Sequence, residues 1–311
     1  MSELYDVIIL GGGPAGLSAG LYAGRSRLTT LLLEKGQPGG QIALSADVAN
    51  YPGQLLEGET GITLANRMAA QCAAFGVERR ADTVRAADLA GEVKRITGGA
   101  GEYQARTVII ATGASPRPIG CENEKEFIGK GISYCATCDG AFFRGLDVYV
   151  AGGGDSAVEE AIYLTRFARK VTIIHRRDTL RAAKSIQEKA LAKEKIGFLW
   201  DSVVERVEGS DILDTLVVRN VKTGERTAIK ADPADGLLGL FGFIGHTPNT
   251  DLFQGQLELK DGYIPTDEDM RTGIPGVFAA GDVRVKSLRQ VVTAAADGAI
   301  AAVQAEKYLM Q

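Results

Sequence analysis

Two of the four cysteines in the chain, Cys135 and Cys138, form a C-x-x-C pair. Thiols at this spacing can close a small disulfide loop on one turn, and such pairs can have lowered pKa values and exchange disulfides readily. Asp139 follows directly and is placed to carry a proton to or from the neighbouring thiolate as a general acid–base group. The pattern indicates a redox site whose reacting groups are Cys135, Cys138 and Asp139.

Half of a zinc site and a pair of inert buried thiols are the alternatives to this interpretation. Zinc needs four ligands. The remaining cysteines, Cys72 and Cys121, and the only histidines, His175 and His246, offer no second pair at ligand spacing. We therefore expect no metal, and we expect Cys72 to pack in the core because it lies in an amphipathic segment.

A glycine-rich motif, Gly11-x-Gly13-x-x-Gly16, follows an apolar run and opens a stretch of small residues at helical spacing. In a dinucleotide-binding turn the first glycine permits the tight turn, the second admits the pyrophosphate, and the third packs helix against strand. The helix N-terminus adds N–H groups and the positive end of a dipole. Glu34 stands 23 positions after Gly11 and is placed to accept a hydrogen bond from a ribose hydroxyl. A glycine-rich turn that binds nothing is the alternative.

A second motif, Gly152-x-Gly154-x-x-Ala157, lies between another strand and helix. Position 23 after its first glycine is basic here, whereas the first motif has an acid. Arginines can bind a 2′-phosphate that a carboxylate would repel. We therefore predict FAD at the first motif and NADPH at the second, with a solvated basic strand end as the alternative. The basic residues are His175, Arg176, Arg177 and Arg181.

Apolar periodicity places both motifs between a strand and a helix. The strand–turn–helix–strand pattern of the first 34 residues restarts at 147, which indicates a duplicated nucleotide-binding unit. We expect strands at 5–10, 30–34, 108–111, 147–151, 170–175 and 277–280, helices at 13–25, 62–75, 156–166 and 290–308, a hairpin of 93–97 with 103–106, and a strand meander over 203–208, 215–221 and 226–231.

The expected fold class is α/β, with two Rossmann-like dinucleotide-binding domains. Candidate boundaries are the Ser115–Pro118 segment and the Gly245–Pro248 turn. Two crossings at these points insert the second domain into the first. The predicted division is an FAD domain of residues 1–115 and 246–311, and an NADPH domain of residues 116–245 that carries the C-x-x-C pair.

Composition excludes several other classes. The chain has 311 residues and a net charge of −4, which argues against a nucleic-acid binder with a broad basic surface. No run of about 18 apolar residues is present, so no membrane partner is expected. The first ten residues do not read as a secretory signal, and a cytoplasmic location is the default. The chain has 39 glycines among 311 residues, more than the usual share of roughly 7%. We expect part of this excess to lie in turns and where the backbone approaches a ligand closely.

These motifs together resemble the bacterial low-molecular-weight thioredoxin reductases, and the resemblance covers essentially the whole chain. Two departures from the commonest pattern are Tyr51, where many relatives carry Trp, and the VKSLRQ run, which resembles only one branch. The resemblance rests on GGGPAG (11–16), PGGQ (38–41), NYPG (50–53), ATGAS (111–115), CATCDG (135–140), GGGDSA (152–157), HRRDTLRA (175–182), GHTPN (245–249) and GDVRVKSLRQ (281–290).

The resemblance implies a homodimer and a larger set of cofactor contacts. Asp282 would hold the ribityl–phosphate region of the flavin, and Arg289, Gln290 and Val291 would lie near the isoalloxazine. The remaining FAD contacts implied are Pro14, Ala15, Lys35, Gly39, Gly40, Gln41, Asn50, Ala111, Thr112, Gly113 and Gly281, and the remaining NADPH contacts are Asp155 and Ser156.

The implied reaction passes electrons from NADPH through FAD and the Cys135–Cys138 disulfide to thioredoxin or a thioredoxin-like protein. Cys138 would face the flavin and Cys135 would attack the partner's disulfide. Domain rotation at the two boundary segments would alternate the half-reactions.

One alternative is a flavin dithiol oxidase, but such an enzyme needs no arginine cluster. Another is a flavin-binding scaffold without enzymatic activity, which would leave the cysteine pair unexplained. A reductase core for a peroxidase system normally carries an extra N-terminal thioredoxin-like domain. We do not expect that domain, because the first strand begins by Tyr5. Relatives that take electrons from ferredoxin have lost the second motif, which is intact here.

Overall fold

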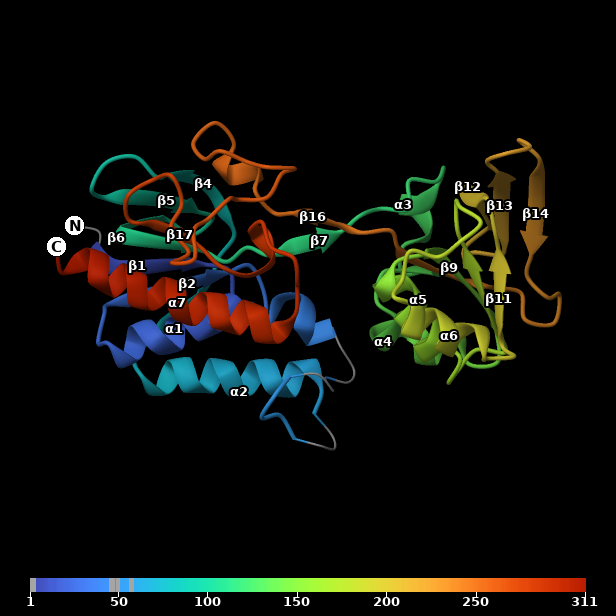
Figure 1. Ribbon diagram of the computed structural model, residues 1–311, viewed down its shortest axis with the longest axis horizontal. Coiled ribbons are helices and arrows are strands. Elements are labelled where there is room, and N and C mark those ends of the chain that lie inside the picture. Colours follow the sequence, from blue (N-terminus) through green and yellow to red (C-terminus); the bar gives the residue numbers. More distant parts are fainter. Residues whose placement is uncertain (1–3, 45–47, 49–50, 56–58) are drawn as a thin grey trace. The chain divides into compact units, whose positions relative to one another are not determined.

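Two compact units make up the computed structural model. Unit 1 comprises Met1–Ser115 and Thr247–Gln311, and unit 2 comprises the intervening Pro116–His246. Each unit has a mainly parallel sheet with helices packed against it (Figure 1), which confirms the expected α/β class. The residues described are 4–44, 48, 51–55 and 59–311.

A seven-stranded sheet forms the centre of unit 1. Strand β1 (Leu4–Leu10) lies between β2 (Thr30–Glu34) and β6 (Glu102–Ile110) and runs parallel to both. Leu10 pairs with Leu33 and with Ile110, so the three strands end at one edge of the sheet. The turns that follow them therefore lie side by side, at the edge where open α/β sheets bind ligands. The other strands are β3 (Glu78–Ala81), β4 (Val84–Asp88), β5 (Lys94–Gly98) and β17 (Val277–Ala279).

Strand β1 sends its side chains alternately into two cores, as the pleat requires. Val7 and Ile9 enter the core on the helix side, and Ile8 and Leu10 enter the opposite one. A strand buried on both faces reads as a continuous apolar run, which is why the sequence revealed it. Figure 1 shows the helices α1, α2 and α7 on one side of this sheet. They are α1 (Pro14–Arg25), α2 (Gly61–Ala74) and α7 (Val291–Leu309).

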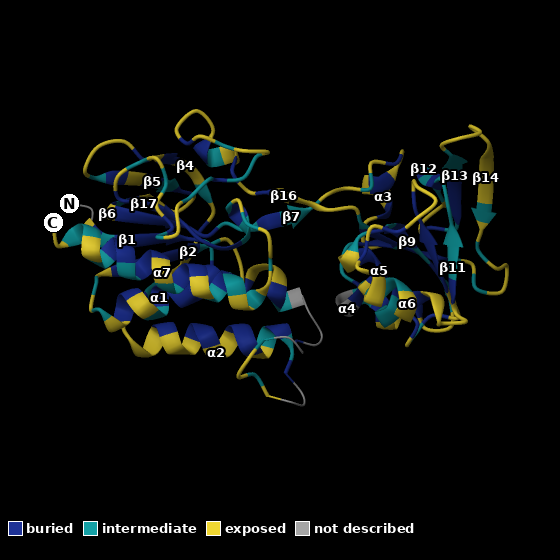
Figure 2. Ribbon diagram, in the orientation of Figure 1, coloured by how far each residue is buried: buried dark blue, intermediate teal, exposed yellow. Residues whose placement is uncertain are grey.

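Unit 2 contains a second, all-parallel sheet in the order β11-β10-β9-β15-β8, beside an antiparallel sheet of β12, β13 and β14. Figure 2 shows the strands of the parallel sheet mainly buried, while β14 is largely exposed. The strands are β8 (Ile132–Ser133), β9 (Asp147–Gly152), β10 (Lys170–Ile174), β11 (Ile196–Leu199), β12 (Ser202–Glu208), β13 (Thr215–Asn220), β14 (Arg226–Lys230) and β15 (Gly239–Phe243), and the helices are α3 (Glu124–Phe127), α4 (Ala136–Asp139), α5 (Asp155–Leu164) and α6 (Lys184–Leu191).

Short elements complete the fold. Strands β7 (Ala114–Pro116) and β16 (His246–Pro248) contain the two points at which the chain passes from one unit to the other. No helix among the described residues is long and apolar enough to cross a membrane. The 3-10 turns are η1 (Gly40–Leu44), η2 (Gly140–Phe143), η3 (Asp251–Phe253) and η4 (Gly281–Val283).

The expected elements differ from the observed ones in a few places. The segments expected as separate strands at 103–106 and 108–111 form the single strand β6. Thr107, the polar residue between these segments, is buried, and its hydroxyl donates a 2.7 Å hydrogen bond to Asp6 O. The elements that were not expected include strands β3, β4 and β11 and helix α6. Their sequences are polar or short, and pairing with neighbouring strands stabilises such strands more than their own propensity does.

Candidate functional site

The first glycine motif forms a turn between β1 and α1 in which two glycines are required by packing. A Cβ on Gly11, whose φ is +109°, would lie 2.3 Å from Ala111 O, and a Cβ on Gly16 would lie 1.8 Å from Gly11 O. Around Gly13 the nearest atom, Gly39 O, is 3.9 Å away. Gly13 is the N-cap of α1, Pro14 follows it, and no side chain caps the helix. The turn thus leaves room and helix N–H groups for an anion where a dinucleotide pyrophosphate would bind.

Glu34 lies against this turn at the end of β2. Its Oε2 accepts a 2.6 Å hydrogen bond from Gly12 N, and a Cβ on Gly12 would lie 3.1 Å from Glu34 Cβ. The carboxylate is therefore fixed beside the motif, as a ribose contact requires. Lys35, which follows it, is exposed.

The second glycine motif repeats this geometry between β9 and α5. A Cβ on Gly152 would lie 2.4 Å from Phe243 O and 2.7 Å from Ala157 Cβ. Gly154 is the N-cap of α5 without a side-chain cap, and the nearest atom to its Cβ position is an Arg181 guanidinium nitrogen at 3.8 Å. At the start of α5, Asp155 accepts a 2.7 Å hydrogen bond from Ala183 N, and Ser156 is exposed. The second unit therefore offers the same kind of cradle, with an arginine at its edge.

His175 occupies in this unit the position that Glu34 has in the first. Its ring packs against Gly153, and Arg181 N donates a 2.7 Å hydrogen bond to Gly153 O. Burial lowers the pKa of His175, and the positive charges of Arg181, Arg177 and Arg176 lower it further, so the imidazole is neutral at pH 7. All three arginines are exposed, and in the described part of the chain no ion pair within 4.0 Å involves them. They are available to an anion.

The C-x-x-C segment begins the short helix α4. Cys135 is in a disulfide, and its backbone N–H donates to Ser133 Oγ at 3.0 Å. Cys135 O accepts hydrogen bonds from Ser133 Oγ at 3.2 Å and from Asp139 N at 3.2 Å. Ser133 is buried, whereas Asp139 is half-buried. The side chain of Cys138 lies outside the described part of the structure.

Cys72 and Cys121 are free, buried thiols. Burial raises the pKa of Cys72 to about 11 and that of Cys121 to about 12. Because the thiolate is the reactive form, neither thiol is suited to disulfide exchange. Cys72 packs in the helix-side core of unit 1, which confirms its expected role. Among the described residues no cluster of His, Cys, Asp and Glu could hold a metal ion.

Residues from a distant loop lie against the first glycine motif. Gly39 N donates a 2.7 Å hydrogen bond to Gly12 O, and a Cβ on Gly40 would lie 3.3 Å from Gly13 Cα. Both loop glycines have positive φ, +114° and +53°. The structure thus brings Gly39 and Gly40 to the predicted pyrophosphate turn. Gln41 is exposed, and Asn50 lies outside the described residues.

The segment after β6 also ends near this edge. Ala111 N donates to Leu10 O at 2.8 Å, and Gly113 has a φ of +68° with open space around its Cβ position. Thr112 exchanges hydrogen bonds with Asn249: its hydroxyl donates to Asn249 O, and Asn249 Nδ2 donates to Thr112 O. Asn249 belongs to the GHTPN segment, to which the sequence assigned no ligand contact.

The C-terminal segment packs onto the start of α1. A Cβ on Gly281, whose φ is +80°, would lie 2.8 Å from Ala15 Cβ. Arg289 stacks over the ring of Tyr263 at 4.1 Å and donates a 3.4 Å hydrogen bond to Asp282 O. Gln290 is the N-cap of α7, and Val291 is its first residue. The glycine motif and the Gly281–Asp282 turn are therefore neighbours in unit 1.

Sequence reasoning missed Asp297, a buried residue of α7 whose carboxylate accepts a 3.0 Å hydrogen bond from Gly281 N. In the Ala-rich helix it reads as an ordinary solvated acid. One signal was present: Asp297 is the only charged residue between Arg289 and Glu306.

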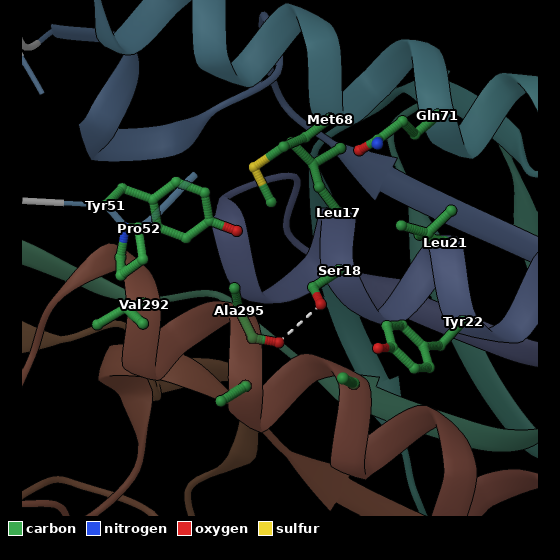
Figure 3. A pocket seen from close by; sticks show the side chains of 12 residues that line it. Leu17, Ser18, Leu21, Tyr22, Tyr51, Pro52, Met68, Gln71, Val292 and Ala295 are labelled. Atoms are coloured by element: carbon green, nitrogen blue, oxygen red, sulfur yellow. Dashed lines mark hydrogen bonds between the residues drawn. The ribbon is translucent and has the colours of Figure 1, made fainter. Parts of the chain in front are cut away.

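A cavity of about 410 Å³ lies in unit 1. Figure 3 shows it between side chains of α1, α2 and α7, with Ser18 donating a hydrogen bond to Ala295 O. None of the predicted site residues lines it. Its lining consists of Leu17, Ser18, Leu21, Tyr22, Tyr51, Pro52, Met68, Gln71, Val292, Ala295, Ala296 and Ala299.

Comparison with known proteins gives consistent matches over the whole length. Residues 5–298 match the family described as pyridine nucleotide-disulphide oxidoreductase. The chain is 56% identical over 310 residues to a thioredoxin reductase of Peptoclostridium litorale, covering 99% of this chain and 98% of that one. It is 46% identical over 313 residues to that of Bacillus subtilis, covering 99% and 96%. The crystal structure of Lactococcus lactis thioredoxin reductase in its FR conformation superposes with a TM-score of 0.90 at 46% identity, covering 98% of this chain and 99% of that one.

Proposed function

This chain belongs to the thioredoxin reductases of the pyridine nucleotide-disulphide oxidoreductase family, and we propose that it carries electrons from NADPH through FAD to a Cys135–Cys138 disulfide and on to thioredoxin or a thioredoxin-like protein. The family uses FAD and NADPH. The observation that carries the proposal is the pairing of two equivalent glycine turns with opposite side chains. Glu34 lies against one, and neutral His175 with its neighbouring arginines lies against the other.

We assign FAD to unit 1. The helix N-terminus after Gly13 would hold the pyrophosphate and Glu34 the adenosine ribose. The loop glycines Gly39 and Gly40 line the same turn. Asp282 would hold the ribityl–phosphate region, and Arg289, which stacks on Tyr263, would lie near the isoalloxazine. When bound, FAD supplies two-electron transfer between the nicotinamide and the disulfide. The remaining FAD contacts proposed are Gly11, Pro14, Ala15, Gly16, Lys35, Gln41, Asn50, Ala111, Thr112, Gly113, Gly281, Gln290 and Val291.

We assign NADPH to unit 2. The cradle at Gly154 takes the pyrophosphate, and the exposed guanidinium groups of Arg176, Arg177 and Arg181 take the 2′-phosphate. Arginine suits this role because its planar fork makes charge-assisted hydrogen bonds to phosphate. Neutral His175 contributes no negative charge that would repel the phosphate. The remaining contacts proposed are Gly152, Asp155, Ser156 and Ala157.

Disulfide exchange in this proposal is performed by Cys135, Cys138 and Asp139. In the reduced dithiol, the Cys135 thiolate attacks the partner's disulfide and forms a mixed disulfide, and one partner thiolate leaves. The Cys138 thiolate then attacks Cys135 Sγ, which restores the intramolecular disulfide and releases the second partner thiolate. Asp139 donates protons to the leaving thiolates and accepts them when the dithiol ionises.

Alternation between the half-reactions is proposed to occur by rotation at the two boundary segments, with residues 1–115 and 246–311 as one domain and 116–245 as the other. Two hydrogen bonds support this placement of the hinges. Asn249 N donates to Gly113 O within unit 1, and Arg117 N donates to Gly245 O within unit 2. Only a few residues of each segment lie between these bonds, so the backbone change would be confined to them.

We also propose that the protein is a cytoplasmic homodimer. Exposed Tyr22 and Val292, which are 44% and 37% accessible, lie beside the cavity of Figure 3 and give unit 1 an apolar surface that a second copy could cover. Light scattering during gel filtration should give twice the chain mass of 32.9 kDa.

The reaction is tested by anaerobic titration of the flavin-loaded protein. NADPH should bleach the flavin absorbance, NADH should do so only at much higher concentration, and oxidised thioredoxin should then restore the colour. Flavin that is bleached by a small dithiol but not by NADPH, and that recovers its colour with oxygen, would indicate the dithiol oxidase instead.

A further inference from the structure

A buried charge cluster lies at the N-terminal half of α7. Asp297 Oδ1 is 2.8 Å from an Arg284 guanidinium nitrogen, and its Oδ2 is 2.6 Å from Lys286 Nζ. The three side chains are only 9%, 12% and 9% exposed. All the other ion pairs found in the described part of unit 1 include a side chain that is more than 40% exposed. This cluster therefore differs in kind from the surface pairs.

The same carboxylate also holds the backbone of η4. Gly281 N donates a 3.0 Å hydrogen bond to Asp297 Oδ2. Arg284 N in turn donates to Gly281 O, and Arg284 Nε donates to Thr266 Oγ1. Asp297 thus binds both ends of the 281–286 segment, at Gly281 and at the two cations.

This segment lies against the first glycine motif. Gly281 contacts Ala15 of α1, and Gly298, the neighbour of Asp297, is so close that a Cβ there would lie 2.0 Å from Ala15 O. The contact of α7 with α1 and the anchoring of η4 therefore come from adjacent residues. Together they join the N-terminal and C-terminal parts of unit 1 at the turn assigned to FAD.

Burying such a cluster is costly, because ions lose hydration, and buried pairs rarely stabilise a fold more than apolar residues would. Two cations also face one carboxylate, so the cluster keeps one excess positive charge. We propose that Asp297 is a positioning residue for FAD: it holds Gly281 and Asp282 in the conformation that receives the cofactor, and its ion pairs fix Arg284 and Lys286 at the other end of the same segment. The inference rests on the assignment of FAD to unit 1.

The test compares Asp297→Ala with Asp297→Asn, which change the net charge equally. Asparagine keeps an oxygen that can accept the hydrogen bond from Gly281 N. FAD dissociation is followed through the rise of flavin fluorescence as the holoprotein is diluted. We expect Asp297→Ala to raise the Kd for FAD by about tenfold or more, and Asp297→Asn by clearly less. Asp269→Ala is the control. Asp269 pairs with exposed Arg271 and accepts a hydrogen bond from Gln304, which lies in α7 like Asp297. The Kd of this variant for FAD should be unchanged.

Equal Kd values for the two Asp297 variants would overturn positioning and leave only a charge effect. If Asp297→Ala binds FAD with the Kd of the unmodified protein, and only the melting temperature of the FAD-free chain falls, positioning is overturned in favour of a purely structural role. If Asp297→Ala does not fold, Lys286→Met provides the second measurement, because it leaves the Asp297–Arg284 pair intact. Its Kd should rise severalfold, and an unchanged value would refute the proposal. A protein that binds no FAD before any substitution would instead refute the proposed function.

Discussion

The imidazole of His175 lies directly against Gly153, and a Cβ on that glycine would be 2.3 Å from Nδ1. In unit 1 the Glu34 carboxylate accepts the Gly12 N–H across the same separation of 22 positions. The two strand–turn–helix units thus have the same architecture but place different side chains against the turn: a neutral imidazole in unit 2 and a carboxylate in unit 1. Because the units differ in chemistry and not in geometry, substitutions at these positions should change which nucleotide each unit prefers.

Neutralising the basic cluster should change the choice of nicotinamide nucleotide. We expect conversion of Arg176, Arg177 and Arg181 to Gln to raise KM for NADPH by about tenfold or more, since a hydrogen bond to a charged group contributes roughly 1.5–3 kcal/mol. KM for NADH should change little, because NADH has no 2′-phosphate. Steady-state kinetics with both nucleotides measures the ratio, and Arg206→Gln, an exposed arginine of the same unit paired with Glu208, is the control. Equal increases for both nucleotides would show that the phosphate binds elsewhere.

Cys135→Ser should abolish reduction of thioredoxin and leave the bleaching of the flavin by NADPH intact. The thiolate that attacks the partner is lost, whereas the nucleotide and flavin contacts are unchanged. Stopped-flow absorbance reports flavin reduction, and a thioredoxin-coupled assay reports turnover. Cys121→Ser is the matched control, since that buried thiol, whose pKa is raised to about 12, should not take part. Normal turnover in the Cys135 variant would refute the proposed reaction.

Gly13→Ala and Gly16→Ala should affect the protein through different steps. A Cβ on Gly16 would overlap Gly11 O, so the chain must shift and lose roughly 1–3 kcal/mol of unfolding free energy. A Cβ on Gly13 would make only an ordinary contact, with Gly39 O at 3.9 Å, and the FAD-free protein should lose no more than about 1 kcal/mol. The affinity of the Gly13→Ala protein for FAD should fall, because the added methyl group would lie where the pyrophosphate approaches the backbone. Urea unfolding and FAD titration measure the two effects, and unchanged FAD affinity in Gly13→Ala would place the pyrophosphate elsewhere.

Glu160 of α5 should make stability depend on pH. Burial, and secondarily the charge of Glu159, raises the pKa of Glu160 to about 7. Because the folded pKa exceeds the unfolded value of 4.5, the folded state binds the proton more tightly. Stability from this group is therefore full below about pH 4.5 and is lost as the pH rises to about 7.

Glu160→Gln should remove this dependence. Relative to the unmodified protein, the variant should gain unfolding free energy between pH 5 and pH 8, by up to roughly 3 kcal/mol at about 1.36 kcal/mol per pKa unit. Urea unfolding at the two pH values provides the measurement. The control is Glu188→Gln, at an exposed position of α6. A gain that is the same at both pH values would show that Glu160 does not titrate in this range.

The sequence predicted the parts of the fold whose residues are buried on both faces. Strands β1, β2, β9 and β10 are continuous apolar runs, and the glycines after β1 and β9 mark turns that tolerate no side chain. Polar strands such as β3, with the sequence ERRA, gave no such signal, because their pairing with β2 depends on a neighbour far along the chain. The role of Asp297 could not be predicted for the same reason. Its partners, Gly281, Arg284 and Lys286, come into contact with it only because the chain turns back from η4 into α7.

The order in which unit 1 acquires its parts matters for the assembly of the protein during synthesis. Unit 2 is a continuous stretch of chain and can complete its contacts once His246 has left the ribosome. Strand β17, η4 and α7 emerge later, and until then β6 lacks a neighbour and Ala15 lacks both Gly281 and Gly298. Uptake of FAD should therefore be a late event. Chains truncated before β17 should contain a folded nucleotide-binding insert, but β6 would lack its pairing with β17. Such an unfinished sheet would make them targets for chaperones or proteases.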